Sequence, residues 1–171
     1  MTQSRTQNPG TIERNRVERR ADAAWTGSLF EGHGNVSVES QAFTKLPITW
    51  ASRTGNADGV TSPEELLAAA HASCFSMALS LVLDEAGTPP EQLTVNATCA
   101  LEQRHDGFRI TSVDLDVSGH VSGIDPRRFE KAVQRAAELC PSLQSAEKQC
   151  RHELASATRI LRALARQPAV S

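Results

Sequence analysis

The stretch SPEELLAAAHASCFSMALSLVLDEAG, residues 62–87, decides the fold, because it is the clearest regular element in the chain. Ser62 has the chemistry of a helix N-cap, Pro63 stands at the first helical position, and Glu65 completes a capping box. Gly87 supplies the C-terminal stop. The stretch therefore predicts one helix of about 24 residues, with Ser62 outside its first turn.

This helix is long and uncharged enough to raise the question of a membrane span. No residue between Leu66 and Leu83 carries a formal charge, and that length reaches the threshold for crossing a bilayer. However, much of the run is Ala and Ser, His71 lies inside it, and neither flank has an aromatic belt or a cluster of Lys and Arg. A helix that is apolar on all sides also occurs at the centre of a soluble core. We therefore predict a core helix and no membrane association.

The composition excludes several classes of protein. The 171 residues suffice for one domain with a core, and a net charge of −2 with a pI near 6.2 argues against a general nucleic-acid binder. Residues 1–22 are polar, lack the apolar region of a secretory signal, and are predicted to be a disordered tail. The cytoplasm is the predicted compartment, so the four cysteines are expected to be thiols. Their spacing does not fit a zinc site.

The segments before the helix predict mainly β-structure, and those after it predict two strands and a second helix. Residues 23–40 read as a β-hairpin, residues 46–52 as a short extended run, and residues 53–62 as a loop. After the helix, two strands with alternating apolar residues are predicted, joined by a turn at Asp106–Gly107. An amphipathic helix over residues 124–141 is predicted next, and Pro141 ends or breaks it. This order predicts an α+β domain with an antiparallel sheet and two principal helices.

The cysteines differ in what their positions predict. Cys99 lies on the apolar face of a strand and reads as a packing residue, whereas Cys150 lies in the C-terminal segment without an evident partner. Cys74 alone also favours packing. Cys140 lies on the apolar stripe of the second helix, next to Pro141, so the two thiols could meet if the two helices pack together. The pattern does not decide between packing and chemistry.

A reactive Cys74 would need a cation near it, because it lies about three turns from the helix N-terminus in apolar surroundings that raise the pKa of a thiol. His71 lies three residues earlier on the same face, where a core histidine satisfied by hydrogen bonds is the simpler interpretation. Arg53, in the loop before the helix, is the other candidate, and Glu64 or Glu65 would either fix its direction or complement the helix dipole.

The helical stretch, followed some sixty residues later by ELCPSL, resembles the OsmC/Ohr family of thiol peroxidases. The match runs from roughly Trp25 to Glu147, and the form HASCFSM is closer to the OsmC branch. The resemblance implies a peroxidase domain over residues 23–147. It also implies an intertwined homodimer, in which a long buried central helix packs against a strongly curved antiparallel sheet.

The resemblance also implies a mechanism and a set of site residues. Cys74 would be the peroxidatic cysteine and Cys140 the resolving cysteine of a disulfide cycle. Arg53 would stabilise the thiolate and orient the peroxide, and Glu64 would hold Arg53. The substrates would be organic hydroperoxides and, more weakly, hydrogen peroxide, in the response to oxidative or osmotic stress. An external dithiol, such as a lipoylated protein, would reduce the disulfide, with no metal or bound organic cofactor.

The C-terminal segment departs from the family pattern, which usually ends in a β-strand. Residues 148–171 read as an atypical basic helix, so the sheet is expected to lack its last strand or to carry an altered tail. Two other functions remain open at this point. One is a non-catalytic redox-sensing or ligand-binding dimer that uses the same thiols. The other is a hydrolase or acyl transferase built on Cys74 and His71, which ranks last because no third orienting residue is identifiable.

Overall fold

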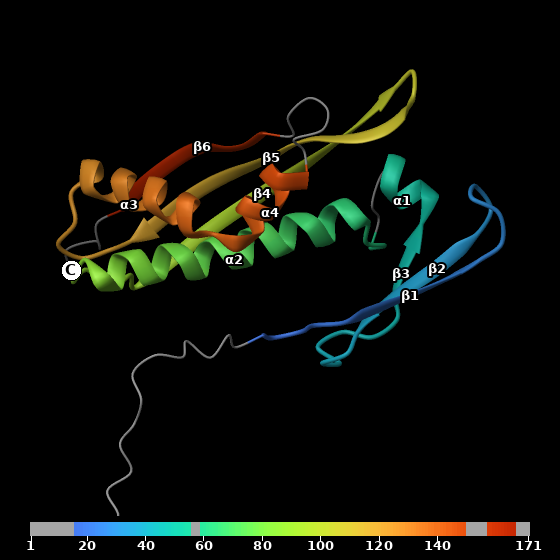
Figure 1. Cartoon of the computed structure of the whole chain (residues 1–171), viewed down its shortest axis with the longest axis horizontal. Coiled ribbons are helices and arrows are strands. Elements are labelled where there is room, and N and C mark those ends of the chain that lie inside the picture. The colour runs from blue at the N-terminus through green and yellow to red at the C-terminus, as the bar shows by residue number, and fades with distance from the viewer. Residues whose placement is uncertain (1–15, 56–58, 150–156, 167–171) are drawn as a thin grey trace, which may run out of the picture.

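The computed structural model describes residues 16–55, 59–149 and 157–166. Within them, two three-stranded sheets and four helices confirm the predicted α+β class (Figure 1). The strands are β1 (Ala21–Thr26), β2 (His33–Val38), β3 (Leu46–Thr49), β4 (Gln92–Arg104), β5 (Gly107–His120) and β6 (Ala157–Arg166). The helices are α1 (Trp50–Thr54), α2 (Pro63–Glu85), α3 (Pro126–Leu139) and α4 (Pro141–Gln149).

The predicted central helix is α2, with 23 residues. Ser62 caps it in an extended conformation, and its hydroxyl oxygen accepts a hydrogen bond from the backbone N–H of Glu65 at 3.2 Å. The other half of the predicted capping box is replaced, because the Glu65 carboxylate accepts from the Thr61 hydroxyl at 3.0 Å. At the far end, Gly87 adopts a φ of +74°, which a glycine reaches without strain, so the chain turns away there.

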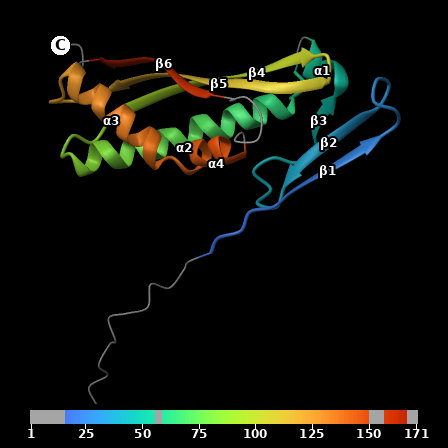
Figure 2. The same ribbon diagram turned by 45° about the horizontal axis from the view of Figure 1, so that its top comes forward.

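The main sheet has the order β4-β5-β6, and the three later helices lie against one of its faces (Figure 2). β4 and β5 pair antiparallel over their whole length, as their alternating residues predict. The connecting turn is His105–Asp106, one residue earlier than predicted, and Gly107 follows it with a φ of +128°. The body of the molecule is thus a two-layer arrangement of helices on a sheet.

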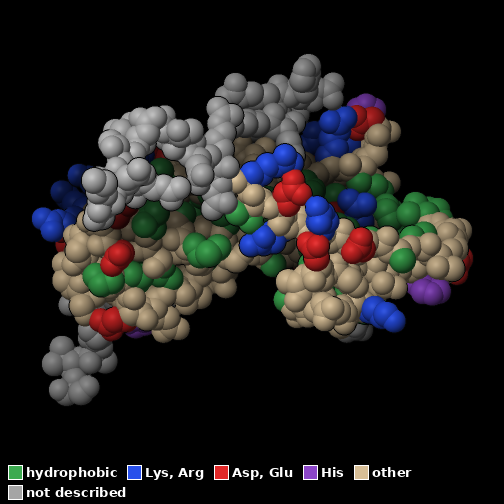
Figure 3. Space-filling view, turned by 60° about the horizontal axis from the view of Figure 1, so that its bottom comes forward, with side chains coloured by type: hydrophobic (Ala, Val, Ile, Leu, Met, Phe, Trp, Pro, Cys, Tyr) green, Lys and Arg blue, Asp and Glu red, His purple; other side chains and the backbone are tan. Residues whose placement is uncertain are grey.

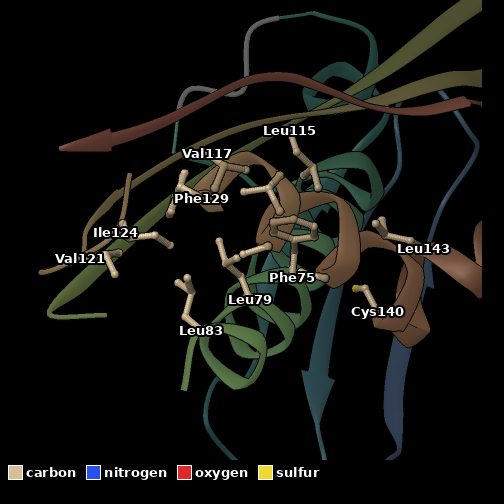
Figure 4. Close-up of a cluster of buried hydrophobic side chains, with 13 residues drawn as sticks. Phe75, Leu79, Leu83, Leu115, Val117, Val121, Ile124, Phe129, Cys140 and Leu143 are labelled. Carbon is tan, nitrogen blue, oxygen red and sulfur yellow. The ribbon is translucent and has the colours of Figure 1, made fainter. Parts of the chain in front are cut away.

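The core lies between these two layers. Every fourth residue of α2 faces inward, which places His71, Phe75, Leu79 and Leu83 in one buried row. Figure 4 shows side chains from α2, β5 and α3 converging on this row, with Phe75 at the centre and Cys140 at one edge. The buried partners from β5 and α3 are Leu115, Val117, Phe129, Ala132, Val133 and Ala136. The apolar stripe predicted for the second helix is therefore confirmed.

The opposite face of α2 is exposed within the described part of the chain. Met77 is 67% exposed and Leu81 is 52% exposed, although both lie in the uncharged part of the helix. Among the described residues α2 is the helix long and apolar enough to cross a membrane, a test that the core helix of a soluble protein also passes. The buried row shows that one side of α2 packs into the core of the protein. The other side exposes apolar residues that the described part of the chain does not cover.

The N-terminal sheet, in the order β1-β2-β3, stands apart from this body and joins it through α1 (Figures 1 and 2). Its β1-β2 hairpin confirms the one predicted over residues 23–40. Trp25, Leu29 and Phe30 are large apolar residues of this region and are exposed. Residues 1–15 of the predicted tail lie outside the described residues, and β1 begins at Ala21.

The surface charges are mixed in sign. In the middle of the face shown in Figure 3, Lys and Arg side chains lie among Asp and Glu side chains. This mixture agrees with the nearly balanced net charge of −2. It offers no strongly basic surface there of the kind that binds a phosphate backbone.

The predicted C-terminal helix is wrong for residues 157–166, which form β6. This strand pairs parallel to β5, from Ser112 opposite Ala157 to His120 opposite Arg166. The expectation that the sheet lacks its last strand is therefore also wrong. The physical reason is that the free edge of β5 offers a row of backbone hydrogen-bonding groups, and pairing with that edge outweighs the local helix preference of Ala, Leu and Arg.

Candidate active site

The structure brings the two predicted reactive thiols together. Cys74 lies on α2 and is half-buried, whereas Cys140 is 0% exposed at the junction of α3 and α4. The Cys140 thiol donates a hydrogen bond to the Cys74 sulfur, and the two Sγ atoms are 3.3 Å apart. A disulfide bond is about 2.05 Å long, so a small shift of either side chain would allow the bond to form. Packing between α2 and α3 creates this contact.

Pro141 determines where Cys140 lies. Proline cannot donate the hydrogen bond that would continue α3, so α3 ends at Leu139 and α4 begins at Pro141. Cys140 caps both helices: its N–H donates to the Ala136 carbonyl at 2.9 Å, and its carbonyl accepts from the Gln144 N–H at 3.2 Å. The bond on each side fixes the backbone of Cys140, so its thiol is held in place beside α2.

Ser142, which the sequence analysis did not single out, contacts the Cys140 thiol. Its hydroxyl oxygen lies 3.2 Å from the Cys140 sulfur. Burial raises the pKa of the Cys74 thiol, but the bonds from Ser142 and Cys140 outweigh burial and leave the pKa below its ordinary value. Cys74 is thus more readily ionised than a free cysteine. The sequence offered no signal for Ser142 beyond its place in the Cys-Pro motif.

The second pair consists of Arg53 and Glu64. Arg53 lies in the last turn of α1 and not in a loop as predicted, because Thr49 and Ser52 form a reciprocal capping box that starts this short helix. The Arg53 Nε–H donates to Glu64 Oε1 at 2.9 Å. The Glu64 side chain is only 8% exposed and that of Arg53 is 33% exposed. This pair therefore lies at the edge of the core.

The Trp50 ring lies beside Arg53 and belongs to a group of three aromatic side chains. The Arg53 guanidinium lies 5.9 Å from the centre of the Trp50 ring, within range of a cation–π interaction. Trp50 in turn makes edge-to-face contacts with Phe30 at 6.0 Å and with Phe108 at 5.2 Å between ring centres. These three rings come from the β1-β2 turn, α1 and β5. Sequence analysis missed them, because no local pattern links segments so far apart.

The remaining candidates take other positions. His71 is 2% exposed, and its Nδ1 bonds to the Leu67 carbonyl at 2.9 Å, while its Nε2 has no partner among the described residues. No hydrogen bond in the described part of the chain joins His71 to Cys74, so the catalytic dyad of a hydrolase is not formed. Cys99 lies half-buried on β4, where burial and then the charge of Glu64 raise the pKa of its thiol. Cys150 lies outside the described residues.

The four predicted site residues thus form two pairs. Cys74 and Cys140 share a sulfur contact, and Arg53 and Glu64 share an ion pair. Within the described residues, no hydrogen bond or ion pair connects one pair to the other. These residues also contain no group of three or more His, Cys, Asp or Glu side chains arranged to hold a metal ion.

Comparisons with known proteins give relatives along most of the chain. The family model OsmC-like protein matches residues 55–155. Peroxiredoxin OsmC of Escherichia coli (strain K12) is 40% identical over 128 residues, which cover 75% of this chain and 89% of that relative. The organic hydroperoxide resistance protein OhrA of Bacillus subtilis is 31% identical over 119 residues, which cover 68% of this chain and 82% of that relative.

Solved structures share the fold. A putative organic hydroperoxide resistance protein from Vibrio cholerae matches with a TM-score of 0.62 and 25% identity, over 91% of this chain and 96% of that one. OhrB of Bacillus subtilis matches with a TM-score of 0.61 and 23% identity, over 85% and 98%. The OsmC-like α+β fold of the subunit, which the resemblance implies, is therefore confirmed. This chain belongs to the OsmC family and lies closer to its OsmC branch than to its organic hydroperoxide resistance branch.

Proposed function

We propose that this chain is a thiol-dependent peroxidase that reduces organic hydroperoxides, and hydrogen peroxide more weakly, in the response to oxidative or osmotic stress. The observation that carries the proposal is the 3.3 Å contact between the sulfur atoms of Cys74 and Cys140, which are 66 positions apart in the chain. A two-cysteine peroxidase needs two thiols within reach of a disulfide. The names of the relatives, Peroxiredoxin OsmC and organic hydroperoxide resistance protein OhrA, support the same activity.

In the first step, the Cys74 thiolate attacks the terminal oxygen of the hydroperoxide. A sulfur–oxygen bond forms, the oxygen–oxygen bond breaks, and the alkoxide takes up a proton and leaves as the alcohol. Cys74 becomes a sulfenic acid. Its lowered pKa supports this role, because the thiolate and not the thiol is the nucleophile.

In the second step, Cys140 attacks the sulfur of that sulfenic acid. A disulfide forms, and the hydroxyl group leaves as water after taking the proton from Cys140. The peroxide has then gained two electrons from the two thiols. An external dithiol, which a lipoylated protein would supply, exchanges with the disulfide and restores both thiols. No metal or bound organic cofactor is required, because the thiols carry both electrons.

We assign Arg53 to the peroxide and Glu64 to Arg53. An arginine stays charged at any working pH, so its guanidinium can stabilise the developing negative charge and orient the oxygen that is attacked. The ion pair with the buried Glu64 carboxylate limits the directions that the guanidinium can take. The Trp50 ring restricts it further.

We also propose that the protein is a cytoplasmic homodimer. The open face of α2, with Met77 and Leu81, and the exposed apolar residues of the N-terminal sheet are the surfaces that a second copy would cover. Sedimentation at micromolar concentration is expected to give a dimer. Met77→Glu places a charge on the open face and is expected to give monomers. A monomeric parent protein would refute this part of the proposal.

The experiment that tests the activity uses the reduced full-length protein and one equivalent of an organic hydroperoxide such as tert-butyl hydroperoxide. Peptide mass spectrometry after a rapid quench is expected to find a disulfide between Cys74 and Cys140 in nearly every subunit. Cys74→Ser is expected to abolish peroxide consumption. Cys99→Ser is the matched control, because Cys99 is also half-buried but lies on β4, and it is expected to retain full turnover.

Turnover with a dithiol separates the enzyme from a redox sensor that uses the same thiols. Repeated peroxide consumption with dihydrolipoamide is expected for the enzyme. A protein that forms the disulfide slowly and does not turn over with this dithiol would refute catalysis. Full turnover by Cys74→Ser would refute the assignment of the nucleophile.

A further inference from the structure

We propose that Ser142 is a positioning residue for the second step of the cycle, the attack of Cys140 on oxidised Cys74. In that step the Ser142 hydroxyl accepts the hydrogen of the Cys140 thiol, and a lone pair of the Cys140 sulfur then faces Cys74. The inference rests on the proposed function, because it assigns a residue to one step of that reaction. It concerns the resolving thiol, whereas Arg53 is assigned to the peroxide.

The first observation is that the Cys140 sulfur lies between two polar atoms. It is 3.3 Å from the Cys74 sulfur and 3.2 Å from the Ser142 hydroxyl oxygen. Within the described residues these two atoms are its hydrogen-bond partners. Cys140 is 0% exposed, so solvent does not offer its hydrogen a third acceptor. A hydrogen that turns away from Cys74 therefore turns toward Ser142.

The second observation is the direction of the contact between the two sulfurs. In the reduced protein the Cys140 thiol donates to the Cys74 sulfur. That direction suits a Cys74 thiolate, which is an acceptor. It does not suit the attack on a sulfenic acid, because the new bond forms with a lone pair of the Cys140 sulfur. The hydrogen must leave the line between the sulfurs, and the Ser142 oxygen is the acceptor within reach.

A serine hydroxyl can fill both roles that this requires. It has one hydrogen to donate and lone pairs that accept, and the 3.2 Å contact fits either direction. Before oxidation the Ser142 hydroxyl donates to the Cys140 sulfur, while Cys140 donates to Cys74. After oxidation the contact between Ser142 and Cys140 reverses. Ser142 itself is unchanged at the end of the step.

The step balances without a further reactant. The bond between the Cys140 and Cys74 sulfurs forms as the sulfur–oxygen bond of the sulfenic acid breaks. The proton that Cys140 loses ends on the hydroxyl group that leaves Cys74, which departs as water. The Ser142 hydroxyl acts on the direction of the Cys140 hydrogen and supplies no electrons.

The backbone holds Ser142 in this place. The Cys140 N–H donates to the Ala136 carbonyl at 2.9 Å, and the Cys140 carbonyl accepts from the Gln144 N–H at 3.2 Å. On the other side of Ser142, Leu143 is 5% exposed and belongs to the core. Ser142 lies between these two fixed points and is half-buried. Its hydroxyl is thus kept beside the sulfur.

The titratable groups on the neighbouring elements are engaged elsewhere. On α3, Glu138 pairs with Arg135 at 2.7 Å on the surface, and on α2 the His71 Nδ1 bonds to the Leu67 carbonyl. Residues 141–145 of α4 carry no formal charge. Within the described residues, Cys74 is therefore the titratable group that bonds to Cys140. The other partner is a neutral hydroxyl.

The test follows the second step by itself. The reduced full-length protein is mixed with one equivalent of tert-butyl hydroperoxide and quenched at increasing times with dimedone, which traps sulfenic acid. Peptide mass spectrometry then gives the fractions of Cys74 present as sulfenic acid and as the disulfide with Cys140. Near neutral pH, Ser142→Ala is expected to close the disulfide about tenfold more slowly than the parent, so sulfenic acid accumulates.

The pH profile distinguishes this role from a structural one. In alkaline solution Cys140 is a thiolate with no hydrogen to redirect, so the rate of disulfide closure in Ser142→Ala is expected to approach that of the parent. A displaced Cys140 would react slowly at every pH. Ser142→Thr keeps a hydroxyl and is expected to restore the parent rate. Ser145→Ala is the matched control, since the Ser145 hydroxyl bonds to the Pro141 carbonyl at 3.0 Å. Its rate is expected not to change.

Four outcomes would overturn the proposal. They are a parent-like rate of disulfide closure in Ser142→Ala, a decrease that persists in alkaline solution, a Thr variant that behaves like the Ala variant, and an equal decrease in Ser145→Ala.

A second arm separates this proposal from the peroxidase activity. Methyl methanethiosulfonate places a methylthio group on Cys74 without peroxide, and Cys140 displaces that group as methanethiol when it forms the disulfide. A slow displacement in Ser142→Ala, in a protein that does not react with peroxide, would support the role of Ser142 and refute the peroxidase. An active peroxidase in which Ser142→Ala slows neither reaction would do the reverse.

Discussion

Replacing Glu64 by Gln is expected to lower the rate of peroxide reduction by weakening the hold on Arg53. Gln keeps an oxygen that can accept from the Arg53 Nε–H at the present 2.9 Å, but it removes the charge. A hydrogen bond between charged groups contributes about 1.5–3 kcal/mol and is roughly twice as strong as a neutral one. Because Arg53 is 33% exposed, we take the lower part of that range, and about 1 kcal/mol is lost. That loss corresponds to about a fivefold decrease in kcat/KM.

Glu65→Gln is the control for this prediction. Glu65 lies in the same first turn of α2, so both variants lose a similar favourable interaction with the helix dipole, about 0.3–1 kcal/mol of stability. The Glu65 carboxylate bonds to Thr61 and not to Arg53. Steady-state rates with tert-butyl hydroperoxide and a dithiol are therefore expected to fall in Glu64→Gln and to stay near the parent in Glu65→Gln.

A second measurement shows whether the charge of Glu64 acts as described. That charge contributes to the raised pKa of Cys99, so Glu64→Gln is expected to lower this pKa and to speed the alkylation of Cys99 near neutral pH. Glu65→Gln is not. Two outcomes would show that the ion pair with Glu64 does not position Arg53 for catalysis. One is an equal decrease in kcat/KM for Glu64→Gln and Glu65→Gln. The other is full activity of Glu64→Gln together with faster alkylation of Cys99.

Three further results are expected. Near neutral pH, iodoacetamide should alkylate Cys74 faster than Cys99, because the pKa of Cys74 is lowered and that of Cys99 is raised. The ratio of the two alkylation rates should fall toward one as the pH rises. Equal rates near neutral pH, measured by peptide mass spectrometry, would contradict this prediction. Leu79→Ala, at a site with 0% exposure, should lower the free energy of unfolding by about 2–5 kcal/mol in urea, and a loss well under that range would mean that the core relaxes around it. Gly119→Ala should lower the free energy of unfolding by about 1 kcal/mol, because the new Cβ would lie 2.8 Å from Leu93 Cδ2 and 3.2 Å from Phe129 Cε2. An unchanged midpoint of urea unfolding would show that both side chains move aside freely.

The elements that were predictable carry their signals locally. Ser62, Pro63 and Gly87 mark the ends of α2 in the sequence, and the structure places the ends within a residue or two of them. The β4-β5 hairpin follows from strict alternation, since a strand with one buried face must repeat every two residues. Pro141 likewise separates two helices by removing a donor.

The elements that were missed depend on distant parts of the chain. Residues 157–166 form a strand because β5 has a free edge, and the sequence of this segment does not report that edge. The short helix α1 had a signal, the capping box of Thr49 and Ser52, but five residues are too few to show a period.

The 66 positions between Cys74 and Cys140 have a consequence for the lifetime of the protein in a cell. A disulfide across a loop of that length removes enough chain entropy from the unfolded state to stabilise the fold by about 4 kcal/mol. The oxidised form would then unfold about a thousandfold less often at equilibrium, and proteases that cleave unfolded chains would spare it. Peroxide would therefore protect the protein that consumes it, and the reduced, resting form would be degraded first.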